Sequence, residues 1–377
     1  HPRLTGGQQD HAAGVGPRDG RVGGGGGGKK TRNGPGRGGG AVDAPLPGFG
    51  AYQTHDPETA MGDAGESLLS LTPLVVDDMF ARIFDTPSPR LVVSDPEHSW
   101  TRELSAPGTG MVVHGDTIAV TIGPDPAKLL LLHLHDGTLI HERELPGDVA
   151  PLLHADIHGI WVQTNAGELT CLSAEGEHRH HVSAENLSHP PVITANLVVA
   201  VRDDGNQIAA LDRPTGKTLW SVNLSAPATA GPVLDGRRIL VPTGNGLQAF
   251  GLDSGTRPAN WNAPPEAIGN TLAMDRSLFA VVTDAGDLLL LDRDTGSERA
   301  RHSGALPGRR PLLERGRIFW ATETTIQSLS RDQLTGTPTE WTDFSWIGTP
   351  TTGLLSHRSK LYLGLTDWGL TQFGEEQ

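Results

Sequence analysis

From about residue 66 onward, short runs of apolar residues alternate with clusters of Gly, Asp, Asn and Pro that favour turns. The dipeptide Asn245-Gly246, for example, lies between two such runs and suits the positive-φ positions of a type I′ hairpin turn. Within 231–262 the pattern therefore predicts four short strands joined by tight turns: 232–234, 238–242, 247–252 and a fourth that carries Trp261.

Two sets of glycines repeat with one common period along this part of the chain. The first set follows Leu-Asp-like pairs at intervals of 39 to 41 residues: Gly137, Gly176, Gly216, Gly255, Gly296 and Gly336. The second set lies in the preceding turn: Gly167, Gly205, Gly246, Gly286 and, two periods later, Gly369. Two independent markers with the same period predict a repeat protein. A single sheet of four short strands cannot bury both of its faces, so we expect the sheets to stack radially.

The predicted fold class is therefore all-β: a β-propeller of four-stranded blades over residues 66–377. Eight units are counted, with bounds of 70–106, 107–148, 149–188, 189–228, 229–268, 269–308, 309–348 and 349–377. Seven blades are the alternative, because the strand pattern of the first unit is weak. The last unit ends after its third strand, and a segment near Ser67 to Leu71 is expected to supply the missing outer strand.

Residues 1–65 differ in composition and are predicted to form a disordered Gly/Arg-rich leader or linker. Residues 20–40 contain twelve glycines and no apolar periodicity, so they cannot bury enough surface to offset the entropy of ordering. Residues 1–40 carry seven Lys or Arg against two Asp, while the whole chain has a net charge of −14. Since phosphate backbones are bound by clustered basic residues, we expect no nucleic acid on the acidic propeller.

One repeat carries a longer motif, Ala210-Leu-Asp212-Arg-Pro-Thr215-Gly216-Lys-Thr-Leu-Trp220. It resembles the pyrroloquinoline-quinone-like (PQQ-like) repeat, whose pattern is roughly A-x-D-x-x-T-G-x-x-x-W. The resemblance implies that Asp accepts backbone N–H groups in an Asx-turn, that Gly takes a left-handed conformation, and that Trp packs between blades. The other units match in part, at Asp253, Gly255, Trp261, Asp292, Gly296, Gly336 and Trp341.

The resemblance includes quinoprotein dehydrogenases and non-enzymatic propellers, such as the lipoprotein scaffold of outer-membrane protein assembly. The dehydrogenases typically stack a vicinal Cys-Cys disulfide on the quinone, which cannot form here because Cys171 is the only cysteine. We therefore expect a non-catalytic, monomeric scaffold that binds protein partners and no cofactor. The alternatives are an enzyme that binds a quinone or small molecule in the propeller channel, and an extracytoplasmic sensor domain of a larger membrane protein.

The compartment stays open at this point. No apolar run reaches the 18 residues that suggest a transmembrane helix, and no signal peptide is visible in a chain that begins with His1. A bacterial cell envelope is expected by analogy with the family alone.

Histidines are unusually concentrated, with nine of the sixteen between His133 and His189. Side chains at i and i+2 of a strand lie on the same face, so neighbouring blades could bring several imidazoles together. The candidate metal ligands are His133, His135, His178 and His180. No acidic residue lies at a recognised ligand spacing from them, so no metal site is predicted.

Propellers commonly bind partners with the loops between second and third strands and the loops between blades. Arg and Trp are enriched in the cores of protein interfaces. The predicted partner-binding residues in these loops are Arg202, Asp203, Asn206, Arg309, Arg310 and Trp368.

Overall fold

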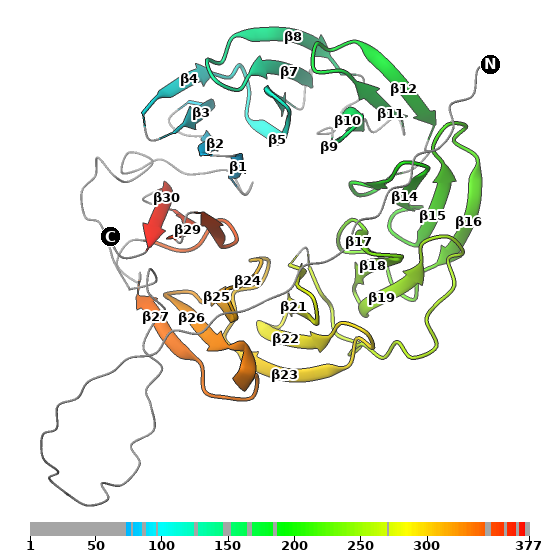
Figure 1. Cartoon of the computed structure of the whole chain (residues 1–377), viewed down its shortest axis with the longest axis vertical. Helices are drawn as coiled ribbons and strands as arrows, with labels where there is room; N and C mark the ends of the chain where they lie inside the picture. The colour runs from blue at the N-terminus through cyan, green and yellow to red at the C-terminus, as the bar shows by residue number, and fades with distance from the viewer. Residues whose placement is uncertain are drawn as a thin grey trace, which may run out of the picture. The chain divides into compact units, whose positions relative to one another are not determined.

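The computed structural model contains eight antiparallel sheets that follow one another along the chain. It describes residues 73–373, apart from 77, 85–87, 96, 124–126, 146–151, 164–167, 184–186, 270, 344–347, 358–359 and 367–368. The sheets are arranged radially in a ring, as Figure 1 shows, so the chain is an eight-bladed β-propeller. The predicted leader at 1–65 and the closing segment near Ser67 to Leu71 lie outside the described residues.

The blades contain three or four described strands each. Blades 1 to 4 are β1 (Leu74–Val76), β2 (Met79–Phe84), β3 (Arg90–Ser94) and β4 (Ser99–Glu103); β5 (Gly108–His114), β6 (Thr117–Ile122), β7 (Lys128–His133) and β8 (Leu139–Glu144); β9 (Leu152–Asp156), β10 (Gly159–Gln163), β11 (Glu168–Leu172) and β12 (His178–Ser183); and β13 (Val192–Ile193), β14 (Leu197–Arg202), β15 (Gln207–Asp212) and β16 (Thr218–Asn223). Blades 5 to 8 are β17 (Val233–Asp235), β18 (Arg238–Thr243) and β19 (Gly246–Gly251); β20 (Ala273–Met274), β21 (Leu278–Val282), β22 (Asp287–Asp292) and β23 (Glu298–Ser303); β24 (Leu312–Glu314), β25 (Arg317–Ala321), β26 (Thr325–Ser330) and β27 (Thr339–Asp343), with the 3-10 helix η1 (Arg331–Gln333) between the last two; and β28 (Leu355–His357), β29 (Lys360–Leu365) and β30 (Gly369–Phe373).

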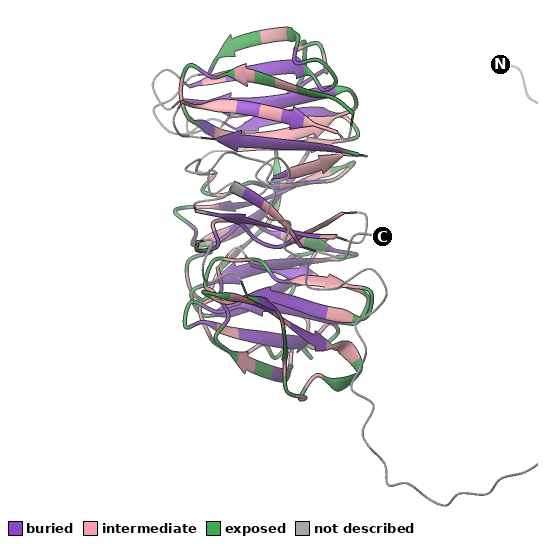
Figure 2. Cartoon of the chain, turned by 90° about the vertical axis from the view of Figure 1, so that its left-hand side faces the viewer, coloured by how far each residue is buried: buried purple, intermediate pink, exposed green. Residues whose placement is uncertain are grey.

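Each blade begins at the inside of the ring, and later strands lie progressively further out (Figure 1). The two middle strands of a blade are the most apolar, because neighbouring blades cover both of their faces. All six residues of β6 are buried, whereas the outer strand β8 of the same blade is mostly exposed. Figure 2 shows the same gradient from buried to exposed strands.

The hydrophobic core is divided among the interfaces between blades. Eight clusters of buried side chains are found in the described residues, and each joins two neighbouring blades. The last cluster closes the ring, because Phe80 and Phe84 of blade 1 pack with Tyr362 and Leu370 of blade 8. The ring centroids of Phe80 and Tyr362 are 4.8 Å apart. The first and last blades are therefore held together by aromatic packing.

The predicted turn chemistry is confirmed in most repeats. Gly216, Gly255 and Gly296 all have φ between 66° and 69°, which favours glycine. Asp212 accepts a hydrogen bond from the Thr215 N–H at 3.1 Å, as an Asx-turn requires. Asp292 accepts the equivalent bond from Thr295 at 3.0 Å.

Asp253 and Gly336 differ from these predictions. Asp253 lies two residues before its glycine, whereas Asp212 and Asp292 lie four before theirs, and it forms an ion pair with Arg237. Gly336 follows η1 and is not among the residues with positive φ. In this repeat the 3-10 helix replaces the tight turn, so a left-handed glycine is not needed.

The prediction that Trp261 lies in a fourth strand is wrong. All residues from 252 to 269 are described, and none of them forms a strand. Pro258, Pro264 and Pro265 lie in this segment, and proline has no N–H to donate to a strand ladder. Blade 5 therefore has three strands, with an irregular proline-rich segment following β19.

Candidate functional site

One end of the ring carries the hairpins between second and third strands together with the connections from each blade to the next. We call this end the connection face, and the opposite end the turn face. The connections that leave blades 4 and 6 pack on the hairpins of those blades. The Ala228 N–H donates to the Gly205 carbonyl at 2.8 Å, and the Ala305 N–H donates to the Gly286 carbonyl at 2.9 Å.

The blade 4 hairpin holds three of the predicted partner-binding residues. Asp203 and Asp204 both have positive φ, 52° and 53°, and both are exposed. The Asn206 side chain donates to the Asp203 carbonyl at 2.9 Å and so braces the turn. Arg202 begins the hairpin at the end of β14 and is half-buried. Among the described residues, neither Asp203 nor Asp204 has an ion-pair partner, so the hairpin presents two uncompensated carboxylates.

The connection from blade 6 to blade 7 holds Arg309 and Arg310. The Arg309 Nε donates to the Pro350 carbonyl at 3.0 Å, which ties this connection to the next one. Partial burial lowers the pKa of Arg309, but a guanidinium remains charged at neutral pH. Gly353 lies against Arg310, and a Cβ at Gly353 would be 3.1 Å from the Arg310 Cβ.

The structure thus forms two separate groups from the predicted partner-binding residues. Arg202, Asp203 and Asn206 share one hairpin of blade 4, while Arg309 and Arg310 share the connection that enters blade 7. Both groups are on the connection face, but blades 5 and 6 lie between them. Trp368 lies outside the described residues.

A pocket of about 470 Å³ opens on the connection face between the outer strand of blade 6 and the hairpin of blade 7. Its floor is formed by small residues of blade 6, including Gly286 and Ala305, both of which are buried. Thr322, Glu323 and Thr324, which follow β25, form one rim. Sequence reasoning did not identify this pocket, because its lining comes from three segments that are separate in the chain.

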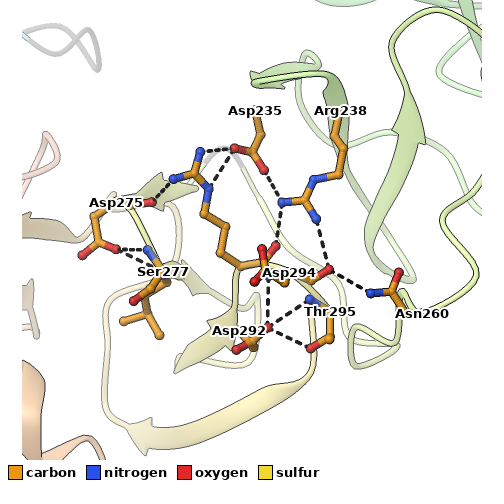
Figure 3. Close-up of polar contacts among 10 residues, drawn as sticks. Asp235, Arg238, Asn260, Asp275, Ser277, Asp292, Asp294 and Thr295 are labelled. Atoms are coloured by element: carbon orange, nitrogen blue, oxygen red, sulfur yellow. Dashed lines mark hydrogen bonds and ion pairs between the residues drawn. The ribbon is translucent and has the colours of Figure 1, made fainter.

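The turn face carries a network of ion pairs that joins blades 5, 6 and 7, and Figure 3 shows its part in blades 5 and 6. The Asp235 carboxylate, whose side chain is 2% exposed, binds Arg238 at 2.6 Å and also pairs with Arg293 of blade 6. Arg293 further donates to the Asp275 carbonyl at 2.6 Å. The Asp275 carboxylate in turn pairs with Arg331 of blade 7 at 2.7 Å.

This network shifts the pKa of Asp235. Burial by itself raises the pKa, but hydrogen bonds from Arg293 and Arg238 and their positive charges outweigh burial. The pKa of Asp235 therefore lies below its ordinary value, and the carboxylate is ionised at neutral pH. The network was not predicted from the sequence. The available signal was the arginine that directly follows the Leu-Asp pair in two repeats, Arg213 and Arg293.

The tryptophan of the repeat motif docks on the following blade. A Cβ at Gly255 would lie 2.6 Å from the Trp220 ring, so the indole fits only against a glycine. The Trp220 Nε1 donates to the Leu252 carbonyl at 3.0 Å, and Trp100 donates to the Leu134 carbonyl at 2.9 Å. Trp261 lies over Gly296 in the same way, although its segment forms no strand. The docking contact thus survives where the outer strand is lost.

Histidine takes the place of tryptophan at some of these docking positions. The positions recur at intervals of 39 to 41 residues: Trp100, His141, His180, Trp220, Trp261, His302 and Trp341. The His302 Nε2 lies 2.7 Å from the Leu334 carbonyl, and its ring stacks on Trp320. His141 lies over Gly176 of the next blade, whereas His180 stacks on Trp161 of its own blade. The repeat spacing was the signal that could have assigned His141 and His302 to packing between blades.

The other three candidate metal ligands, His133, His135 and His178, do not occupy these docking positions. His133 ends β7, and His135 lies beyond the strand, 3.8 Å from Asp116. His178 begins β12. Across residues 73–373 as described, no group of three or more His, Cys, Asp or Glu side chains is placed to hold a metal ion. The described part also contains no helix with the length and apolarity needed to cross a bilayer.

The radial sheets define a β-propeller, and its Asp-Thr-Gly-Trp turns resemble those of PQQ-like repeats. The chain is similar to the outer membrane protein assembly factor BamB, whose family model matches residues 165–267. BamB of Alkalilimnicola ehrlichii is 28% identical over 169 residues, which are 42% of this chain and 40% of that protein. The match therefore spans less than half the length of that relative.

Solved structures show the same fold at low identity. The crystal structure of BamB from Moraxella catarrhalis covers 83% of this chain and 97% of its own, with a TM-score of 0.64 and 16% identity. The computationally designed Ika8 protein gives the same TM-score at 12% identity, covering 83% of this chain and 98% of its own. Sqt1 of Saccharomyces cerevisiae has a TM-score of 0.62 at 13% identity, covering 83% and 97%. At these identities the likeness concerns the fold alone.

Proposed function

We propose that this protein is a non-catalytic, monomeric scaffold of a bacterial cell envelope, and that it binds protein partners through its connection face. Two matches support the class of function: the family model at 165–267 and the relative from Alkalilimnicola ehrlichii, both described as outer membrane protein assembly factors. The envelope location and the use of protein partners come from these relatives.

The observation that carries the proposal is the blade 4 hairpin, which lies inside the matched segment. Asp203 and Asp204 are consecutive non-glycine residues with left-handed backbone, a conformation that Asp tolerates better than most residues in hairpin turns. Both side chains are exposed, and the turn is braced by the bond from Asn206 to the Asp203 carbonyl. Left-handed backbone at non-glycine residues tends to cluster where binding is performed.

Arg309 and Arg310 extend the proposed contact surface to a second position on the same face. An arginine presents five N–H donors on a rigid fork, which suits carboxylates and carbonyls of a partner. The two groups on blades 4 and 7 would contact different parts of one partner, because blades 5 and 6 separate them.

The test is affinity capture of envelope proteins with the full chain as bait, measured by quantitative mass spectrometry. The test variant combines Arg309→Ala and Arg310→Ala. The matched control combines Arg237→Ala and Arg276→Ala, which removes two exposed arginines from the turn face. We expect the test variant to lose partners that the wild-type chain and the control retain. Retention of every partner by the test variant would contradict the proposed face.

A further inference from the structure

We infer that the pocket between blades 6 and 7 receives an arginine side chain presented by an extended segment of the partner protein. This inference rests on the proposed function and specifies the chemistry of one part of the connection face.

The backbone keeps the pocket open. Gly286 has φ of 86° and Gly304 has φ of 87°, which disfavours any larger side chain at either position. A Cβ at Gly286 would approach the Ala305 carbonyl oxygen to 3.1 Å. A Cβ at Gly304 would meet no atom within 4 Å, so this side of the pocket is empty space. Neither glycine therefore places a side chain in the volume of about 470 Å³.

The walls have both apolar and polar character. Leu306 and Pro307 contribute aliphatic surface on one side, and Thr324 contributes a hydroxyl group on the other. The Thr322 hydroxyl is engaged within its own turn, where it donates to the Thr325 carbonyl at 3.1 Å. An arginine or lysine side chain buries its methylene stem along apolar surface while its charged group reaches polar atoms. This combination of walls suits such a side chain better than a wholly apolar one.

The charge around the pocket selects a cation. Glu323 on the rim and Asp284 in the neighbouring hairpin have no ion-pair partner among the described residues. Asp287, which also lines the pocket, pairs with Arg301 at 2.9 Å. Arg301 is shared with two further carboxylates, Glu266 and Glu298, so one guanidinium faces three carboxylates.

The nearby basic groups do not neutralise this charge. The Arg309 Nε donates to the Pro350 carbonyl on the blade 8 side of its connection. His302 directs its Nε2 to the Leu334 carbonyl. Arginine is preferred over lysine as the occupant because its planar fork can bind a carboxylate through two parallel hydrogen bonds.

The experiment titrates the isotope-labelled full chain with the peptide acetyl-Gly-Arg-Gly-amide and follows amide chemical shifts by NMR. The comparison peptide replaces Arg with citrulline, which has nearly the same shape and no charge. We expect saturable shifts at 303–307 and 322–324 with the arginine peptide, and weaker binding of the citrulline peptide.

Glu323→Gln is expected to weaken binding of the arginine peptide roughly five-fold, the upper range for a partly exposed ion pair. Asp332→Asn is the control, since Asp332 is an exposed carboxylate of the same blade on the turn face. Equal binding of the two peptides, or no saturable shift in the pocket, would overturn the inference.

These outcomes are separable from the proposed function. If the Arg309 and Arg310 variant loses captured partners while the peptide does not bind, the scaffold proposal stands and the pocket inference fails. If the peptide binds while the Arg309 and Arg310 variant retains every partner, the pocket binds arginine as inferred and the assignment of partner binding to Arg309 and Arg310 fails.

Discussion

Asp235→Asn tests how strongly ion pairs between blades stabilise the ring. The side chain of Asp235 is 2% exposed and holds two arginines, Arg238 from its own blade and Arg293 from the next. Asparagine has the same shape but no charge, so the substitution leaves both guanidinium groups without their carboxylate. Arg238 begins β18 and Arg293 lies in the turn after β22, 55 residues apart in sequence, so the change acts on contacts between blades.

The expected loss of stability is about 2–3 kcal/mol. Removing one partner of a fully buried ion pair costs roughly 3–5 kcal/mol. The arginine side chains here are 23% and 27% exposed, and each also donates to backbone carbonyls, so solvent and these bonds reduce the cost. The difference in free energy of unfolding is measured by urea titration, with tryptophan fluorescence as the readout of the unfolded fraction.

Asp253→Asn is the matched control in the same blade. The Arg237–Asp253 ion pair has side chains that are 84% and 58% exposed, and exposed pairs contribute only about 0–1 kcal/mol. If Asp235→Asn destabilised the protein no more than this control, the proposed role of the buried network would be wrong.

The effect of Asp235→Asn also depends on pH, with a defined sign. The pKa of Asp235 is lower in the folded protein than in the unfolded chain, where an aspartate has a pKa of about 3.9. The stabilisation by this group is thus present above the unfolded value and is lost as pH falls through the folded value. We expect the difference between wild type and variant to be largest near neutral pH and to shrink in acid. A difference that stayed constant with pH would refute the electrostatic explanation.

Two further predictions concern packing between blades, and a third concerns the buried thiol of Cys171. Trp220→Ala removes a large side chain and its hydrogen bond to Leu252, and should lower the free energy of unfolding by about 3 kcal/mol in urea titration. His302→Phe keeps an aromatic ring against Trp320 but loses the hydrogen bond to the Leu334 carbonyl. The free energy of unfolding should fall by about 1 kcal/mol, which thermal unfolding would show as a lower melting temperature. Burial raises the pKa of Cys171 to about 11, so iodoacetamide at pH 8 should alkylate the folded protein slowly and the urea-unfolded chain rapidly.

The repeat architecture could be predicted in detail because its signals are local. Gly216, Gly255 and Gly296 end up with positive φ, and Asp212 and Asp292 form the expected Asx-turns, since these features depend on four or five consecutive residues. The eight predicted units also contain the eight observed sheets. A weak first unit left seven blades as an alternative, and packing of that unit against blade 8 resolves the number.

The outer strand around Trp261 could not be predicted correctly from the repeat alone. The repeat places a tryptophan there, and the tryptophan does dock on Gly296. The prolines at 258, 264 and 265 prevent a strand ladder while leaving the docking contact possible. Side-chain packing and backbone pairing are thus separable in this blade.

The sequence by itself determined the repeat period, most of the strands and most of the turns, because each is specified within one repeat of about 40 residues, while the number of blades was left at eight or seven. Only the tertiary structure decided which repeats meet and what lies between them. The ion pair between Asp235 and Arg293, the ring closure by Phe80 and Tyr362, and the pocket rimmed by Glu323 all join residues from different blades. Such contacts depend on how the blades stack, and apart from the repeated Trp or His docking position, the periodicity of the chain does not indicate which side chains face each other across an interface.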